Sequence, residues 1–302
     1  MKVFEPHANY SFVTAILPRQ STGRVIEQVL ASGAAHALTQ NARGSVMKDR
    51  WYRSFLPSLS PEQEIINFLV PNQETDHLME EIVMVGNLRA YGAGSIFATA
   101  CKEFVCADDY PLWKPGSYRF ESVSFDIRFK EDLVVITHIA DKGEAEGIAR
   151  AAIKAGAQGS TISYSRGYGL RDRLGLLRIT KKHEKELVTV VVDQCDVDAV
   201  FDAMAQTGRV DQPGSGFIYQ VPTLRGLTNL SSVFHPNKHS ASIQQIVRAL
   251  DEIQGDTHWR ANHLLIHDPK AAEFKQATLG TIQDSVVFNV VSHRKDTDVL
   301  LD

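Results

Sequence analysis

The sequence predicts an α+β protein built from tandem βαβ–βαβ units, because the same series of landmarks occurs more than once. A helix-like run ends in a Gly-Ala pair, and an Arg-Gly pair follows at a constant spacing. A strand-like run that leads into a helix beginning with Asp then follows in three copies. A repeat this long exceeds the roughly 20–50 residues of a solenoid unit, so it indicates small domains in tandem. The landmarks are Gly33-Ala34 with Arg43-Gly44, Gly156-Ala157 with Arg166-Gly167, and three strands that contain Ile66, Val188 and Val287.

The elements of the first repeat follow from its apolar pattern and its Pro and Gly residues. Tyr10–Leu17 is apolar and β-rich, and Pro18 closes it. Thr22 is the expected N-cap of a helix with apolar residues at helical spacing, and Gly33 its expected C-terminal glycine. The further elements predicted are a strand at 36–42, a polar loop from 43 to 63, a strand at 65–70, a helix at 74–85, a glycine-rich turn at 86–94 and a strand at 95–100.

The second repeat has the same predicted order of elements. Two split βαβ units of this kind form a four-stranded antiparallel sheet with two helices on one face, the ferredoxin-like arrangement. The expected elements are a strand at 133–139, a helix at 144–154, a strand at 160–165, a loop at 166–185, a strand at 187–192, a helix at 197–207, a turn at 208–216 and a strand at 217–221.

These repeats define three expected domains. Residues 1–109 form the first repeat, residues 110–230 the second with a connecting strand, and residues 231–302 a partial third with a helix at 242–253 and strands at 263–267 and 285–291. A sheet with helices on one face leaves its other apolar face uncovered. The sheets are therefore expected to pack on one another, as a pseudo-trimer within one chain or as a homo-oligomer.

Composition restricts the class of partner and the compartment. A net charge of −4 argues against a nucleic-acid partner, which requires a clustered basic face. The odd set Cys101, Cys106 and Cys195 indicates reduced thiols rather than a disulfide framework. No run approaches the roughly 18 apolar residues of a membrane span, and the start has no signal-peptide pattern. We expect a cytoplasmic protein without a membrane span.

Four motifs resemble those of the P-II family of nitrogen-regulatory signalling proteins. The helix–Gly-Ala–strand segment is one, and Gly167-Tyr168-Gly169 is similar to the Gly-Phe-Gly that opens the family's T-loop. Phe55-Leu56-Pro57 resembles the end of that loop. The most specific motif runs from Thr207-Gly208-Arg209 to Gly214-Ser215-Gly216, and it resembles the B-loop that cradles phosphate. The segment Gly86–Phe97 resembles it a second time.

The resemblance implies a non-enzymatic regulator that controls a partner enzyme or transporter through its loops. It implies ATP or ADP as a regulatory ligand and no required cofactor. Ser95 and Phe217 stand where the family has a phosphate-binding lysine, and a lost charged hydrogen bond of this kind costs about 1.5–3 kcal/mol. Arginines are the expected replacement. The expected nucleotide-binding residues are Gly167, Gly169, Thr207, Gly208, Arg209, Gly214, Ser215, Gly216 and Arg225.

Two other interpretations of the protein stay open. In the first, the turns contain glycine only because their backbone needs a positive φ. The protein is then a scaffold that binds a partner protein and no nucleotide. A metal-associated trimer of the CutA type shares the fold, and His263 and His267 lie on one face of an expected strand. Tyr52 is the one candidate for the modification that the family carries at its T-loop tip.

Overall fold

The computed structural model describes residues 7–45, 62–90, 93–106, 113–114, 127–167, 184–212 and 215–228. Their helices and strands belong to one compact unit, Met1–Ser165 with Glu184–Gln245, except for Arg166 at the end of one strand. The second unit comprises Arg166–His183 and Ile246–Asp302, of which Arg166 and Gly167 are described. The predicted third repeat, including His263 and His267, and the predicted loop residues Tyr52 and Phe55-Leu56-Pro57 lie outside the described residues.

Each repeat contains four strands and two α-helices in the predicted order. A short 3-10 turn precedes the second helix of each, at Asn72–Glu74 and Gln194–Asp196. The first repeat comprises β1 (Tyr10–Pro18), α1 (Arg19–Ser32), β2 (Leu38–Gly44), β3 (Glu62–Pro71), α2 (Thr75–Val85) and β4 (Ser95–Cys101). The second comprises β5 (Leu133–Asp141), α3 (Ala145–Ala155), β6 (Thr161–Arg166), β7 (Glu184–Asp193), α4 (Val197–Thr207) and β8 (Phe217–Pro222), and β9 (Arg225–Thr228) follows.

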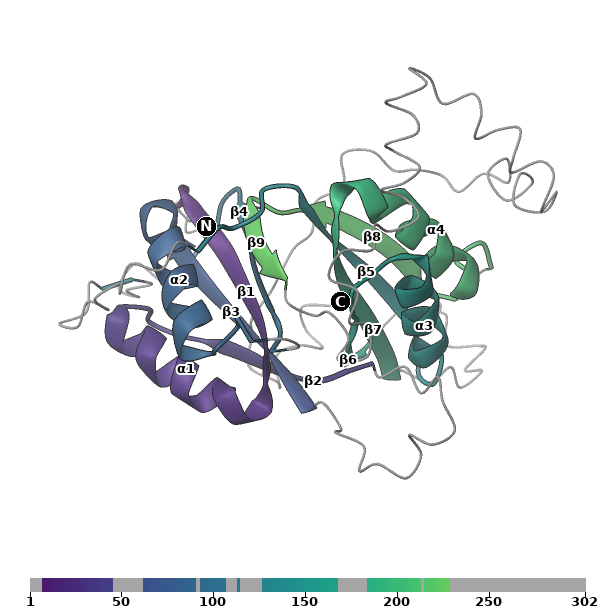
Figure 1. Cartoon of the computed structure of the whole chain (residues 1–302), viewed down its shortest axis with the longest axis horizontal. Coiled ribbons are helices and arrows are strands. Elements are labelled where there is room, and N and C mark those ends of the chain that lie inside the picture. The colour runs from purple at the N-terminus through teal and green to yellow at the C-terminus, as the bar shows by residue number, and fades with distance from the viewer. Residues whose placement is uncertain are drawn as a thin grey trace, which may run out of the picture. The chain divides into compact units, whose positions relative to one another are not determined.

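The strand order confirms the α+β, ferredoxin-like fold class. The first repeat has the order β2-β3-β1-β4, and the second has the matching order β6-β7-β5-β8, all antiparallel. In both, the first strand lies between the third and the fourth, as two split βαβ units require. Helices α1 and α2 lie together against the first set of strands, and α3 and α4 against the second (Figure 1).

The two four-stranded sheets join into one nine-stranded sheet. The end of β2 pairs with the beginning of β6, with Arg43 opposite Ile162 and Gly44 opposite Thr161. Strand β9 belongs to the second repeat in sequence, yet it pairs with β4 of the first, with Leu227 opposite Ile96. The second repeat therefore contacts the first at both of its edge strands, β2 and β4.

The prediction that Thr22 caps α1 is wrong. The helix begins at Arg19, directly after Pro18, and Thr22 lies buried inside it, where its hydroxyl donates to the Pro18 carbonyl at 3.5 Å. Pro18 ends β1 with φ −58°, so its ring geometry starts the helix without a capping side chain. The predicted role of Gly33 is confirmed: it caps the helix at φ 134°, and its N–H donates to the Val29 carbonyl.

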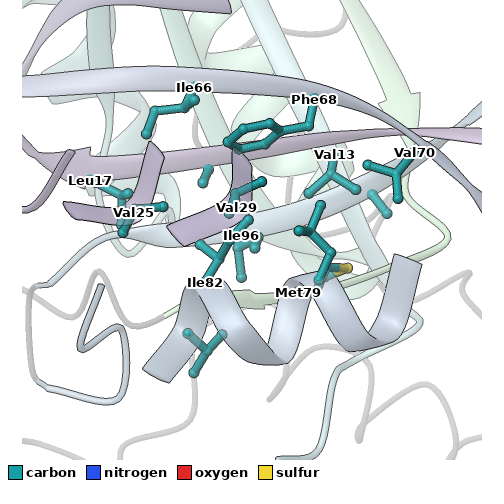
Figure 2. Packing of buried hydrophobic residues seen from close by; sticks show 14 of the residues in the cluster. Val13, Leu17, Val25, Val29, Ile66, Phe68, Val70, Met79, Ile82 and Ile96 are labelled. Carbon is teal, nitrogen blue, oxygen red and sulfur yellow. The ribbon is translucent and has the colours of Figure 1, made fainter. Parts of the chain in front are cut away.

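Apolar side chains between helices and sheet form one core in each repeat. In the first core, Phe68 and Ile66 of β3 meet Val25 and Val29 of α1 and Met79 of α2 (Figure 2). The second core holds the matching strand and helix positions of the second repeat. A third, smaller cluster joins residues from β1–β4 to residues from β5 and β7, so the two repeats share a core. Its members are Ile16, Ala42, Ile65, Phe97, Leu133, Val135 and Val191.

Candidate functional site

The turn between α4 and β8 holds most of the site residues predicted from the sequence. Thr207 is the last residue of α4, and Gly208, Arg209, Ser215 and Gly216 follow in the turn. Gly167 lies directly after β6, and no described contact joins it to this turn. Gly169 and Gly214 lie outside the described residues.

The same turn occurs between α2 and β4 of the first repeat, with the same hydrogen bonds. Arg209 has φ 51°, and its counterpart Asn87 has φ 53°. Gly216 and Gly94 both have positive φ, and a Cβ on either would overlap a carbonyl oxygen, of Ile139 or Ile16. The matched amide donors are Asn87, Leu88, Ala90 and Ala93 in the first turn and Arg209, Val210, Gln212 and Ser215 in the second.

These hydrogen bonds limit what the turn offers to an anion. Five amides of the second turn, including that of Gly208, donate to carbonyls of α4 or of the turn itself. An amide that is already bound inside the protein does not form a cradle for phosphate. Most of the positive charge that the described part of the turn presents to a ligand therefore comes from a side chain rather than from the backbone.

This positive charge belongs to Arg209, whose side chain is 59% exposed. One guanidinium nitrogen lies 3.2 Å from a carboxylate oxygen of Glu144, the residue before α3. An ion pair this exposed contributes at most about 1 kcal/mol. The guanidinium is therefore available to a stronger anionic ligand at a small cost.

Below the turn lies His138, a buried residue that the sequence analysis did not single out. It belongs to β5, is fully buried, and neither ring nitrogen has a hydrogen-bond partner among the described residues. Its ring fills the space beside Gly208, where a Cβ would overlap the imidazole. Burial lowers the pKa of His138 to about 4, so the imidazole is neutral near pH 7.

The structure does not bring Arg225 to this turn. Arg225 begins β9, pairs with Ala98 of β4, and one guanidinium nitrogen lies 2.5 Å from a carboxylate oxygen of Asp76 in the first turn of α2. Both partners belong to the first repeat. The resemblance to the P-II family suggested that Arg209 and Arg225 serve one site, but the chain crosses to the other repeat between them.

A second polar cluster lies where β2 meets β6, at the base of the two predicted T-loops. Arg43 donates through Nε to the Tyr164 hydroxyl at 2.8 Å and through Nη1 to Glu146 in the first turn of α3. The Ser45 hydroxyl donates to the other Glu146 oxygen at 3.3 Å. Burial acts to lower the pKa of Arg43, but the hydrogen bonds to Glu146 and Tyr164 outweigh it, and the pKa is raised. The Arg43-Gly44 repeat was the only sequence signal of this cluster.

The structure shows neither a metal site nor a membrane helix in the residues it describes. No group of three His, Cys, Asp or Glu side chains there is arranged to hold an ion. No helix of that part is both long and apolar enough to cross a membrane. Cys101, Cys106 and Cys195 take part in no disulfide and are partly exposed.

One family model matches the second repeat. Residues 133–226 match the family model described as nitrogen regulatory protein P-II, which covers less than half of the chain. Among solved structures, PII of Arabidopsis thaliana bound to citrate is similar, with 22% identity, 31% of this chain and 76% of that chain covered, and a TM-score of 0.25. No curated protein matches. The matched residues are a P-II-like unit, and the family consists of regulatory signalling proteins.

Proposed function

We propose that this chain, whose residues 133–226 match the P-II family, is a non-enzymatic regulator that binds an adenine nucleotide or a similar small anion. The observation that carries the proposal is the exposed guanidinium of Arg209, held at the α4–β8 turn by a left-handed backbone and a weak ion pair. The guanidinium is charged at every physiological pH and presents a planar pair of donors that matches a phosphate.

Ligand affinity at this turn is expected to be modest. Phe217 occupies the position after the last glycine, so no ammonium supplements Arg209 there. A missing charged hydrogen bond costs about 1.5–3 kcal/mol, or roughly one to two decades of affinity. Micromolar binding is the expected range, which suits a sensor whose ligand must dissociate as its concentration falls.

The first turn of α3 offers a route from the ligand to the loops. Glu144 contacts Arg209, and two residues later Glu146 contacts Arg43 and Ser45. A phosphate that takes Arg209 away from Glu144 therefore acts on the helical turn that holds the end of β2. Residues 46–61 and 168–183 follow the two strands of this seam, and we propose that they contact the regulated enzyme or transporter. The mechanism is a shift in loop populations by differential ligand affinity, without bond-making.

Calorimetric titration with ATP, ADP and AMP tests the proposal. The informative variant is Arg209→Asn, because Asn is the residue that the first repeat has at the matching position, with nearly the same φ. The backbone conformation is thus preserved while the charge is removed. We expect binding in the native protein and a roughly 10- to 100-fold loss of affinity in the variant. Equal affinities of the two proteins would remove Arg209 from the site.

Arg225→Ala separates the two repeats in the same titration. Because Arg225 pairs with Asp76 of the first repeat, its loss should leave binding at the α4–β8 turn unchanged. A loss of binding in Arg225→Ala, with Arg209→Asn unaffected, would move the ligand to the first repeat. A loss in both variants would mean that the ligand depends on both repeats.

A scaffold without nucleotide is the second candidate function. Two observations favour it: the turn uses five of its amides internally, and an exposed phenylalanine replaces the expected lysine. In this case the repeats present their loops to a partner protein without a small ligand. No heat with any nucleotide, from protein with native circular dichroism, would support the scaffold over the sensor.

A further inference from the structure

The two helix-to-strand turns rest on side chains of different chemistry. Among the atoms nearest to the missing Cβ of Gly86, in the first repeat, are methyl groups of Leu17 and Val25. At the matching Gly208 of the second repeat, the nearest atoms all belong to the imidazole of His138. A polar ring therefore packs against the second turn at the place where hydrocarbon packs against the first.

This difference arises from an exchange of sizes at two strand positions. In β1 the two residues are Ala15 and Leu17, and at the matching places in β5 they are His138 and Ala140. All four are fully buried. Each pair combines one small and one large side chain, so the second repeat keeps the packing of the first while it places a titratable ring in the core.

The surroundings of the ring are apolar, and they offer no partner to its nitrogens. Neither nitrogen has a hydrogen-bond partner among the described residues. Val188 of β7 and Ile218 of β8 lie directly opposite His138 on the neighbouring strands. A buried polar group without a partner is unfavourable and rare in native proteins, so its presence requires an explanation. The buried residues of α4, the helix above the strand, are Val197, Val200, Met204 and Ala205.

The charged groups on the elements around the ring are engaged or turned outward. Glu186 lies on the same face of β7 as Val188, and its carboxylate accepts from the amides of Gly143 and Ala145. The other charged residues of β7, α4 and the turn are at least partly exposed, namely Glu184, Lys185, Asp193, Asp198, Asp202, Arg209 and Asp211. Burial is thus the cause of the lowered pKa of His138, and a proton on the ring meets no counterion there.

The second turn is also held to its core less firmly than the first. Leu88 in the first turn is fully buried, and its amide donates to the Val83 carbonyl at 2.9 Å. The matching Val210 is half-buried, and its amide donates to the Ala205 carbonyl at 3.3 Å. Opening of the second turn therefore exposes less apolar surface, and segments with little buried apolar surface are those that open locally.

We propose that the α4–β8 turn is a pH-sensitive latch, which opens by lifting Gly208 off His138 and is held open by a proton on the freed imidazole. An imidazolium has two N–H donors, and the closed core has no acceptor for either. In the open turn water reaches the ring, which then has the ordinary pKa near 6.5 instead of about 4. The open turn binds the proton more tightly, so a fall in pH through this window favours opening. The first turn, which rests on Leu17 and Val25, does not respond.

The latch also regulates the ligand site, a consequence that rests on the proposed function. Arg209 directly follows Gly208, and its left-handed backbone, with φ 51°, belongs to the closed turn. A ligand that requires this position of the guanidinium binds the closed turn and competes with the proton. Acidic conditions therefore weaken binding at this site without a change in the charge of the arginine.

Hydrogen exchange of the full chain without ligand, followed by NMR at pH 8 and pH 5, tests the latch. Each exchange rate is divided by the intrinsic rate of an unstructured amide at the same pH. We expect protection in the second turn to fall about 30-fold from pH 8 to pH 5, because an opened imidazole with a pKa near 6.5 favours the protonated form by that ratio at pH 5. Protection in the first turn should stay unchanged. The matched amides are those of Gly86, Asn87 and Leu88 and those of Gly208, Arg209 and Val210.

The first turn is the control within the same molecule, and His138→Leu is the control variant. The variant should keep the pH 8 protection of its second turn at pH 5. An equal fall in both turns overturns the proposal, because unfolding of the whole protein then carries the exchange. A second turn that does not respond to pH overturns it as well, and so does a full response in His138→Leu. Since no nucleotide is present, these outcomes are independent of whether the protein binds one.

Discussion

At the scale of single residues, His138 makes the stability of the fold depend on pH. In the folded state its pKa is about 4, and in the unfolded chain it returns to the ordinary value near 6.5. Between these values the unfolded chain binds a proton and the folded protein does not. The free energy of unfolding therefore falls as the pH is lowered through this window, and His138 contributes no loss above about pH 7.

We expect His138→Leu to remove this dependence. The native protein should lose about 2 kcal/mol of unfolding free energy between pH 8 and pH 5 through this one residue, and the variant should not. Leucine has a similar volume and leaves no buried nitrogen without a partner. Urea denaturation of both proteins at the two pH values measures the difference, in which the other histidines cancel. Identical pH slopes would show that His138 keeps its ordinary pKa.

At the scale of elements, each helix-to-strand turn depends on its last glycine. Gly94 and Gly216 have positive φ and also lie against a carbonyl oxygen, whereas Gly143 has a positive φ with no atom within 4 Å of its missing Cβ. Alanine at Gly143 should lower the free energy of unfolding by about 1–2 kcal/mol, because only the left-handed backbone is unfavourable there. Alanine at Gly94 or Gly216 adds a steric overlap and should lower the free energy of unfolding further. Chemical denaturation of the three variants gives the ranking, and equal losses would contradict the packing described here.

Element bounds were predictable where apolar residues recur with one clear period. Helix α4 was expected at 197–207 and is found at Val197–Thr207, because its apolar face and the Gly208 that follows mark both ends. Strands β3 and β7 extend beyond their predicted bounds, because polar residues at their ends, such as Gln63 and Glu186, pair with the neighbouring strand without adding to the apolar pattern. Strand β9 was missed, because Arg225–Thr228 is short and has little apolar pattern, and its partner β4 is distant in the chain.

At the scale of the whole molecule, the seam between β2 and β6 couples the two repeats. We expect the double variant Arg43→Ala/Glu146→Ala to lose less unfolding free energy than the sum of the losses in the two single variants. The two side chains are partly exposed, so the coupling energy should be about 0.5–1 kcal/mol and should shrink in high salt. A double-mutant cycle by urea denaturation at low and high salt measures it. Strict additivity would show that the pair contributes nothing.

The candidate site was predictable only in part, for reasons of distance along the chain. The glycines of the α4–β8 turn are local signals, and the sequence identifies the turn without help from the fold. The contacts Arg209–Glu144 and Arg43–Glu146 join segments far apart in sequence, and no periodicity marks them. His138 lies in an apolar strand run, where its neighbours give no sign that it is packed against Gly208. The domain limits and a third repeat that completes a pseudo-trimer stay predictions.

Because β9 follows β8 in the chain but pairs with β4, the sheet of the first repeat is completed only after the second repeat has been synthesised. The first repeat leaves the ribosome with β4 complete at Cys101, but the strand that covers it ends at Thr228. At about 5–20 residues per second, the nascent first repeat spends roughly 6–25 s with an open apolar edge. During that interval it is a substrate for chaperones or for a neighbouring nascent chain. A ribosome stalled between the two repeats would release a fragment that cannot close its own sheet.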